Sequence, residues 1–322
     1  MSKNEKAEGV VPVFKLIGYG LLIVGLVFGL TGSASAQWTT TPITSNTYDD
    51  LYPQIHNGII TWSGSDGSDY EIFMYDVASG TTTPITSNAY DDLHSQIHNG
   101  IITWYGNESG SDFEIFMYDV ASSTTTPITN NANNDLHSQI HNGIITWQGW
   151  DDIDYEIFMY DVASGTTTPI TNNANNDWYP EIDNGIITWY GSDGSDYEIF
   201  MYDVASGTTT PITSNAYDDF YPQIHNGIIT WYGYEGGSDS EIFMYNVVSG
   251  TTTQITSNAN DDWSPEIDNG IITWHGNEGG SDYEIFMYSR QMQVPALTSI
   301  GLIALVGLLS AIATVKIVRK RR

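Results

Sequence analysis

Carboxylates are the side chains with which this sequence could do chemistry, and they recur at fixed places. The most regular set is an aspartate that stands before the first predicted strand of each repeat, at Asp50, Asp92, Asp135, Asp177, Asp219 and Asp262. A ring of such carboxylates around a central opening would bind a cation, because hard cations prefer oxygen ligands. The alternative, which we favour, is that each aspartate bonds the backbone N–H groups of its own turn.

A second set of carboxylates lies in loops between predicted strands. Asp66-Gly-Ser-Asp69 and Asp193-Gly-Ser-Asp196 match part of the D-x-[DN]-x-[DN]-G calcium loop. Two interpretations are open for these loops. Either they bind Ca²⁺ specifically, which makes Ca²⁺ the candidate cofactor, or they form a solvated acidic surface suited to a salty medium.

A third set would recognise a ligand at the mouth of a central channel. These positions on the innermost strands vary, whereas the rest of the repeat is nearly uniform. The candidate residues are Tyr52, His94, His137, Tyr179, Tyr221, Trp178 and Trp263. Exposed positions on a rigid scaffold are where recognition is often placed, and sequence drift is the alternative explanation.

The motifs of common enzymes are absent from the sequence. It contains no G-x-S-x-G, no H-E-x-x-H and no cysteine, and residues 37–289 contain no lysine. Acid–base catalysis needs carboxylates in distinct environments, and the acidic loops are expected to be alike and solvent-exposed. We therefore predict that the protein is not an enzyme.

These candidate residues belong to six copies of one repeat. The tryptophan of a Gly-Ile-Ile-Thr-Trp segment recurs at Trp62, Trp104, Trp147, Trp189, Trp231 and Trp274, at spacings of 42 or 43 residues. A Glu-Ile-Phe-Met-Tyr segment follows each tryptophan. A fixed period in this range is typical of an array of one supersecondary unit.

Each repeat predicts four short strands. In the first copy the extended runs are residues 51–56, 58–63, 70–76 and 80–86. Asn57-Gly58 joins the first two runs and is typical of a two-residue hairpin turn. The middle two runs are apolar on both faces, so each sheet should pack between two others, with the tryptophans in the interfaces.

Four strands in about 42 residues match the size of a propeller blade. The predicted fold is therefore all-β, a six-bladed β-propeller of four-stranded antiparallel blades. The last repeat ends after its third strand, near Tyr288, and the missing strand stands at the front of the chain, in residues 38–46. We expect this N-terminal strand to complete the last blade and close the ring, which removes the open edges.

The repeat resembles a known type. It runs P-Q-I-H-N-G-I-I-T-W and then D-Y-E-I-F-M-Y-D-V-A-S-G-T-T-T-P-I-T. It is similar to the TolB-type β-propeller repeat, in the version found in surface proteins of methanogenic archaea, and the resemblance covers residues 38–289. Its first turn is His-Asn-Gly or Asp-Asn-Gly, where that family often has Pro-Asp-Gly or Tyr-Gly-Asp. The resemblance implies an archaeal surface propeller but little about function, because such propellers serve many functions.

The segments around the propeller predict export and anchoring. Residues 1–36 have a lysine-containing leader, an apolar run and a small-residue motif, which predict a signal peptide; an uncleaved anchor is the alternative. Residues 37–289 are the propeller and residues 290–294 a linker. Residues 295–315 predict a transmembrane helix, and the basic tail at 316–322 predicts a cytoplasmic C-terminus with the propeller outside.

The C-terminal segment also resembles the sorting signals of archaeosortases and exosortases. Both consist of a proline motif, an apolar helix and a basic tail. This chain has Pro295-Ala296-Leu297 where those signals usually have Pro-Glu-Phe or Pro-Glu-Pro.

The charge of the chain limits the classes of molecule that the protein can bind. The formal charge is −30, and all nine Lys and Arg residues lie outside residues 37–289. In the predicted topology the loops between second and third strands lie at the same end as the loops between blades, so most carboxylates share one face. Such a face repels nucleic acid and anionic lipid, and it attracts divalent cations and basic proteins.

The predicted function is binding or architecture at the cell surface, through the acidic face of a membrane-anchored propeller. The expected partners are the membrane, through the C-terminal helix, and divalent cations or a basic protein or envelope component; nucleic acid is excluded. Two alternatives are open. One is a cation-dependent enzyme of lyase or glycosidase type at the channel mouth, and the other is a purely structural envelope protein.

Overall fold

The computed structural model describes residues 39–107, 110–234, 236, 239–277 and 282–289. The chain divides into two compact units, residues 1–45 and 46–322. In the first unit, the described residues 39–45 form no helix or strand. The predicted signal peptide, linker, transmembrane helix and basic tail lie outside the described residues. Within the described part of the chain, no helix is long and apolar enough to cross a membrane.

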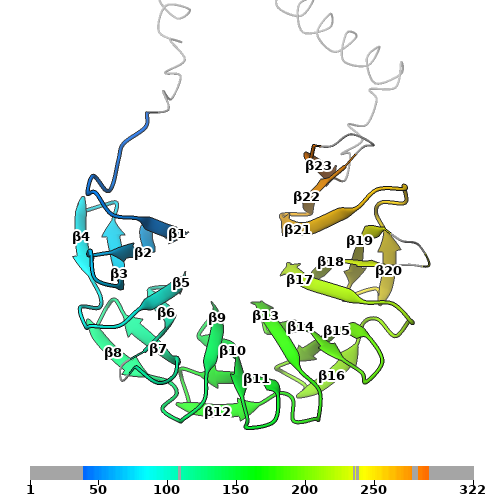
Figure 1. Cartoon of the computed structure of the whole chain (residues 1–322), viewed down its shortest axis with the longest axis horizontal. Coiled ribbons are helices and arrows are strands. Elements are labelled where there is room, and N and C mark those ends of the chain that lie inside the picture. Colours follow the sequence, from blue (N-terminus) through cyan, green and yellow to red (C-terminus); the bar gives the residue numbers. More distant parts are fainter. Residues whose placement is uncertain (1–38, 108–109, 235, 237–238, 278–281, 290–322) are drawn as a thin grey trace, which may run out of the picture. The chain divides into compact units, whose positions relative to one another are not determined.

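The second unit contains six antiparallel sheets in chain order, as the repeat predicts (Figure 1). The first sheet consists of β1 (Asp50–His56), β2 (Ile59–Ser65), β3 (Tyr70–Asp76) and β4 (Thr81–Pro84). The second consists of β5 (Asp92–His98), β6 (Ile101–Gly106), β7 (Glu114–Asp119) and β8 (Thr124–Pro127). The third consists of β9 (Asp135–His141), β10 (Ile144–Trp150), β11 (Tyr155–Asp161) and β12 (Thr166–Pro169).

The remaining sheets repeat this order of strands. The fourth consists of β13 (Asp177–Asp183), β14 (Ile186–Ser192), β15 (Tyr197–Asp203) and β16 (Thr208–Pro211). The fifth consists of β17 (Asp219–His225), β18 (Ile228–Tyr234), β19 (Ser240–Asn246) and β20 (Thr251–Gln254). The sixth consists of β21 (Asp262–Asp268), β22 (Ile271–Gly276) and β23 (Glu284–Ser289).

The Asn-Gly dipeptides make the hairpin turns between first and second strands. Asn57 has a φ of 49° and Gly58 a φ of 79°. Both residues are therefore left-handed, as a type I′ turn requires, and asparagine and glycine are the residues that tolerate this conformation. The predicted hairpin register is confirmed, since His56 pairs with Ile59 across the turn.

Consecutive sheets pack on one another through apolar residues of their middle strands. The first strand of each sheet contacts the first three strands of the preceding sheet, so β1, β5, β9, β13, β17 and β21 form a row (Figure 1). We call this row the first-strand row. At the third interface, Ile157 of one sheet clusters with Ile187 and Trp189 of the next. The prediction that the middle strands are covered on both faces, with tryptophans between sheets, is thus confirmed for the inner sheets.

The sixth sheet differs from the prediction. It has three strands, and the described residues 39–46, which were expected to supply the fourth, contain no strand. A fourth strand normally follows its partner after a four-residue turn, whereas this one would have to close a loop of more than 200 residues, which costs entropy. The edge shows the consequence, because Ile285 of β23 is 78% exposed and its counterpart Ile242 in the fifth sheet is 0% exposed.

Candidate functional site

The aspartate that opens each first strand binds the tryptophan of the second strand. In the third sheet, Oδ1 of Asp135 accepts a hydrogen bond from Nε1 of Trp147 at 2.9 Å. Oδ2 of Asp135 accepts a second bond from Nδ2 of Asn131 at 2.6 Å. Asp135 is paired with Gly149, and a Cβ at that glycine would lie 2.3 Å from Oδ1, so only glycine leaves room for the carboxylate.

The same aspartate–tryptophan bond occurs in all six sheets. Burial, which is the largest cause, raises the pKa of four of these aspartates to about 7; they are Asp92, Asp135, Asp177 and Asp219. The oxygens of these residues already have donors within their own repeat. Among the described residues, no close cluster of three acidic groups includes them. The prediction that each aspartate bonds backbone N–H groups of its own turn is wrong, because the donors are the side chains of a tryptophan and an asparagine. The geometry favours a packing role over the ring of cation ligands.

The third residue of each first strand has an unusual backbone. These residues are Tyr52, His94, His137, Tyr179, Tyr221 and Ser264, and their φ angles lie between 50° and 55°. None is glycine, so each left-handed residue costs about 1 kcal/mol or more. The cause is a β-bulge that shifts the register of every first pair of strands. A bulge re-aims a side chain, and here it acts at the positions that vary most.

The rings of the re-aimed side chains follow one another along the first-strand row; Tyr52 and His94 are stacked, and the later pairs are tilted. Ring centroids are 4.1 Å apart for Tyr52 and His94, 6.3 Å for His94 and His137, 4.4 Å for His137 and Tyr179, and 4.9 Å for Tyr179 and Tyr221. We call these five residues the ring ladder. Five of the seven predicted channel residues thus lie together, each on a different sheet.

A second layer of side chains supports the ring ladder from the second strands. Tyr190 stacks on Tyr179 with centroids 5.9 Å apart, and Tyr232 stacks on Tyr221 at 6.0 Å. Elsewhere a smaller side chain binds the bulge itself, as where the amide N–H of Tyr179 donates to Oε1 of Gln148 at 2.9 Å. Burial, followed by the neighbouring His94, lowers the pKa of His137 to about 4, so this ring is neutral at pH 7.

The two predicted tryptophans do not join the ring ladder. Trp178 packs against Tyr155 of the preceding sheet, with ring centroids 4.5 Å apart. Trp263 packs against Tyr283 and His275 of its own sheet, at 5.8 and 6.0 Å. Both stand one residue before the bulged position, where the side chain contributes to packing rather than to the ladder.

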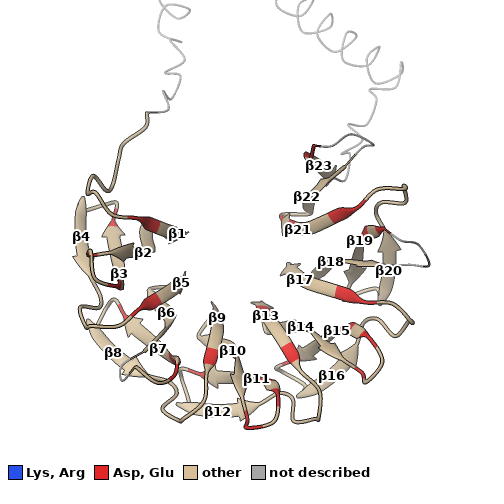
Figure 2. Cartoon of the chain, in the orientation of Figure 1, with Lys and Arg blue, Asp and Glu red and all other residues tan. Residues whose placement is uncertain are grey.

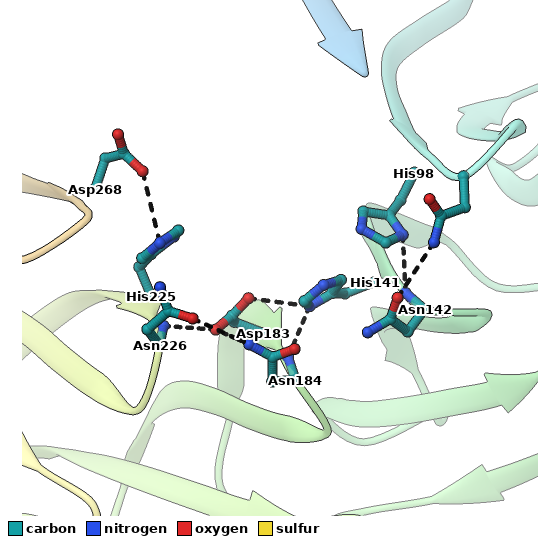
Figure 3. Close-up of polar contacts among 9 residues, drawn as sticks. His98, His141, Asn142, Asp183, Asn184, His225, Asn226 and Asp268 are labelled. Atoms are coloured by element: carbon teal, nitrogen blue, oxygen red, sulfur yellow. Dashed lines mark hydrogen bonds and ion pairs between the residues drawn. The ribbon is translucent and has the colours of Figure 1, made fainter. Parts of the chain in front are cut away.

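The Asn-Gly turns, which join the first and second strands, form a row of polar side chains (Figure 3). We call this end of the sheets the turn end. The amide N–H of Asn142 donates to Nδ1 of His98 at 3.0 Å, and that of Asn184 donates to Nδ1 of His141 at 2.7 Å. The fourth sheet carries Asp183 in place of histidine, and its Oδ2 accepts the amide N–H of Asn226 at 2.6 Å. Each turn is therefore tied to the next by a side chain.

Nδ1 of His141 also lies 3.0 Å from Oδ1 of Asp183. One nitrogen cannot accept the N–H of Asn184 and donate a proton to Asp183 at the same time. Burial, the largest cause, lowers the pKa of His141, and we therefore assign the acceptor form to this nitrogen. Burial and the neighbouring histidines lower the pKa of His98 to about 4, so this ring is neutral at pH 7.

Two carboxylates, Glu181 and Glu266, break the symmetry of the first strands. Glu181 stands two residues after Tyr179, where most sheets carry glutamine, and its Oε1 accepts a hydrogen bond from Nε2 of Gln139 at 2.9 Å. Burial, followed by the charge of Glu266, raises the pKa of Glu181 to about 8, against the hydrogen bonds of Gln223 and Gln139. Sequence reasoning missed this residue, although the change from glutamine to glutamate is visible in the repeat.

The acidic loops lie at the other end of the sheets, which we call the loop end. The amide N–H of Tyr70, after the loop of the first sheet, donates to Oδ1 of Asp91 in the connection to the second sheet at 3.0 Å. This contact confirms that both kinds of loop meet at one end. Figure 2 shows acidic residues on every sheet and neither Lys nor Arg among the described residues.

The loop carboxylates come together in groups of three. Asp66 and Asp69 lie with Glu71, and Asp193 and Asp196 lie with Glu198. A third group, Asp151, Asp154 and Glu156, was not singled out by the sequence because its loop lacks the glycine of the calcium pattern. The expectation that the acidic loops are uniformly wet is wrong, since Glu71, Asp154, Glu156 and Glu198 are buried. They are covered because the connection to the next sheet closes over them.

Comparison with solved structures identifies the fold. The chain is similar to the β-propeller domain of the Trilobed protease from Pyrococcus furiosus, described as having an open velcro topology, with 11% identity, a TM-score of 0.56 and coverage of 74% of this chain and 78% of that one. It is also similar to dipeptidyl peptidase 4 of Porphyromonas gingivalis, with 9% identity, a TM-score of 0.60 and coverage of 77%, but it spans only 45% of that enzyme.

An oligogalacturonate lyase in complex with manganese is a further similar structure, with 10% identity, a TM-score of 0.52 and coverage of 72% of this chain and 71% of that one. The sequence matches no protein-family profile and no curated protein. At such low identities these likenesses show the fold alone. The chain is therefore an all-β protein with a β-propeller fold, and the narrower assignment to the TolB-type archaeal repeat stays a prediction from its motif.

Proposed function

We propose that the chain is a binding module displayed at the cell surface, and that its ligand lies on the ring ladder. The single observation that carries this proposal is the row of five neighbouring rings on bulged, left-handed backbone in consecutive sheets. Backbone strain of this kind persists where the surrounding structure enforces it, and it clusters at functional sites. All six sheets keep the strained backbone at this position, but the side chain differs between them. This combination is expected of a position that contacts a ligand.

The chemistry of the ladder selects a cationic ligand. Tyr52 is 50% exposed and Tyr221 is 40% exposed, so both aromatic side chains are accessible to a partner. Aromatic faces attract ammonium and guanidinium groups by cation–π interaction. The surrounding domain contains carboxylates and no Lys or Arg, which draws cations toward it and steers anions away. We therefore propose a Lys- or Arg-rich polypeptide segment as the ligand class.

Display outside the cell is part of this proposal. It rests on the signal-peptide pattern of residues 1–36, and on the apolar run and basic tail of residues 295–322. The acidic loop end adds long-range attraction for a basic partner, while the ring ladder supplies the short-range contacts. A purely structural role would leave the ladder without a ligand, so binding experiments separate the two.

The test is fluorescence anisotropy with the full chain in detergent and a labelled Lys/Arg-rich peptide as the probe. Tyr179→Ala should weaken binding about tenfold, because one desolvated cation–π contact is removed. Tyr217→Ala is the matched control: this exposed tyrosine lies on the connection before β17, and its removal should leave affinity unchanged. Equal losses in both variants, or no binding by the wild type at low salt, would refute the proposal.

The catalytic alternative has one observation in its favour, the raised pKa of Glu181. A carboxylic acid that stays protonated at pH 7 is suited to general acid catalysis. The similar lyase suggests an acidic oligosaccharide with Mn²⁺ as the reaction to assay. The charge of −30 opposes an anionic substrate, so we expect no turnover of oligogalacturonate by the wild type. Turnover that Glu181→Gln abolishes would revive the enzyme hypothesis.

A further inference from the structure

Three loops at the loop end contain the same arrangement of carboxylates. Each has the pattern Asp-x-x-Asp-x-Glu, with the final glutamate at the start of the third strand. The groups are Asp66, Asp69 and Glu71; Asp151, Asp154 and Glu156; and Asp193, Asp196 and Glu198. In each group one oxygen of every residue lies within 4.8 Å of the others. Two oxygens on opposite sides of one Ca²⁺ lie about 4.8 Å apart, because Ca²⁺–oxygen distances are about 2.4 Å.

The strongest evidence for a ligand is that buried oxygens in these groups have no partner. Asp154 is 4% exposed, and neither of its carboxylate oxygens has a hydrogen bond. Glu156 is 1% exposed, and its Oε2 is likewise without a partner. The same glutamate oxygen is unpartnered at Glu71 and Glu198, but also at Glu114 and Glu241, which belong to no group of three among the described residues. Buried polar atoms are almost always bonded, so the two unpartnered oxygens of Asp154, which lie inside a group of three carboxylates, point to a missing ligand.

The described part of the protein offers these groups no positive side chain. It includes neither Lys nor Arg, so without a bound cation the buried carboxylates lose their charge only by protonation, and burial raises the pKa of Glu71, Asp154 and Glu198 accordingly. Carboxylates buried side by side repel one another and lose hydration, and each contribution destabilises the folded state. A hard cation removes both costs, because it supplies positive charge and coordinates oxygen directly.

We propose that the first, third and fourth blades each bind a divalent cation of the Ca²⁺ class through these three carboxylates. The proposal is independent of the ring ladder, which lies on other residues. In each site the glutamate links two blades: Oε2 of Glu71 faces the cation, and Oε1 accepts the amide N–H of Asn88 in the connection to the next blade at 2.7 Å. The bound cation therefore stabilises the contact between consecutive blades.

The test uses the full chain in detergent, stripped with EDTA and titrated with Tb³⁺ and then with Ca²⁺. Tyr70, Tyr155 and Tyr197 stand between the last two carboxylates of the three sites, so Tb³⁺ bound there should show tyrosine-sensitised emission. Ca²⁺ should displace it, and calorimetry should count the sites. Asp154→Asn should reduce the Ca²⁺ stoichiometry by one. Asp161→Asn, which removes one charge from the far end of the same strand, should not change it.

Thermal unfolding provides a second measurement, in which the effect of Asp154→Asn on the unfolding temperature should differ between EDTA and Ca²⁺. In EDTA, Asp154→Asn should unfold at a higher temperature than the wild type, because the variant removes a buried, unpaired charge. In Ca²⁺ the wild type should gain more than the variant, because one site is lost. NaCl at matched ionic strength should reproduce neither difference.

Three results would overturn the proposal. They are the absence of saturable Ca²⁺ binding, an equal loss of stoichiometry in Asp154→Asn and Asp161→Asn, and equal stabilisation by NaCl and CaCl₂. Should Asp154→Asn fail to fold, Asp69→Asn and Asp196→Asn test the same claim in the other two blades. Mg²⁺ is the comparison ion, and a preference for Mg²⁺ over Ca²⁺ would overturn the assignment to the Ca²⁺ class.

Discussion

The loop end and the turn end of the sheets are both rows of polar side chains, but they solve the problem of burial differently. At the turn end, His98, His141 and Asp183 accept the amide N–H of the following turn, so these three side chains have partners in the next sheet. At the loop end, both oxygens of Asp154 and Oε2 of Glu156 are buried without a partner. The turn end therefore makes most of its polar contacts within the protein, whereas at the loop end we propose that a cation from outside supplies them.

This difference shows which end of the sheets should depend on ions for its stability. A row that is closed by its own hydrogen bonds depends little on ions. A row of buried carboxylates depends strongly on them, because nothing else offsets the charge. The predictions below test this contrast by perturbing one end while leaving the other end as the control.

The largest effect should come from removing a loop-end carboxylate that already has donors. Asp135→Ala leaves Nε1 of Trp147 and Nδ2 of Asn131 without an acceptor, so we expect the free energy of unfolding to fall by about 3 kcal/mol. Asp161→Ala at the turn end removes exposed bonds to the amides of Ala163 and Ser164, which water can replace, and should cost about 1 kcal/mol. Urea titrations measure both. Equal costs would mean that the buried network contributes no special stability.

The second prediction concerns pH in the presence of EDTA. Burial raises the pKa values of Asp92, Asp135, Asp177 and Asp219 to about 7, above the ordinary aspartate value of 3.8, so the folded state binds more protons between these values. Stability should therefore be greatest at low pH and fall by at least about 1.4 kcal/mol as pH rises from 4 to 7. A rise over this range, measured by urea unfolding at fixed ionic strength, would contradict the assignment.

The contribution of the turn end to stability should change with pH in the opposite direction, falling as the pH falls. The pKa of His98 is lowered from 6.5 to about 4, so its contribution is present above pH 6.5 and is lost as pH falls toward 4. His98→Asn should remove that loss, and the variant should gain more stability than the wild type on acidification. Parallel pH profiles for the two proteins would show that His98 does not titrate with folding.

A smaller effect is expected in the turns themselves. Asn142 has a φ of 49°, and alanine at this angle should cost about 1 kcal/mol. Asn142→Gly should cost less than half as much, because glycine takes positive φ freely and only the side-chain contact with Asn99 is lost. Thermal unfolding of the pair measures the difference. An equal cost would mean that the side-chain contact, rather than the backbone angle, matters at the turn end.

The smallest effect at neutral pH is expected at Glu181. Its pKa of about 8 keeps it protonated at pH 6, so Glu181→Gln should change stability there by only a few tenths of a kcal/mol. Above pH 8 the wild type must bury a charge that the variant lacks, so the variant should become the more stable protein. Glu284→Gln at the exposed edge of β23 is the control and should give parallel profiles.

Much of the fold was predictable from short stretches of the sequence. The Asn-Gly dipeptides placed the hairpins correctly, because only a few residues accept positive φ at both turn positions. The apolar Ile-Ile-Thr-Trp and Ile-Phe-Met-Tyr runs indicated strands covered on both faces, and five interfaces between sheets confirm this. The ring ladder was predicted in part, since variation at Tyr52 and its counterparts marked the position but not the bulge.

The sequence by itself determined the repeat, the four-stranded unit and the absence of basic side chains from the propeller. Tertiary structure alone decided which polar atoms find partners, because those partners lie in another strand or in the next blade. Asp135 meets Trp147 through strand register, while Glu156 is buried because the connection to the next blade covers it. It also decided that the sixth sheet keeps three strands, since pairing over more than 200 residues depends on closure entropy that local pattern does not report.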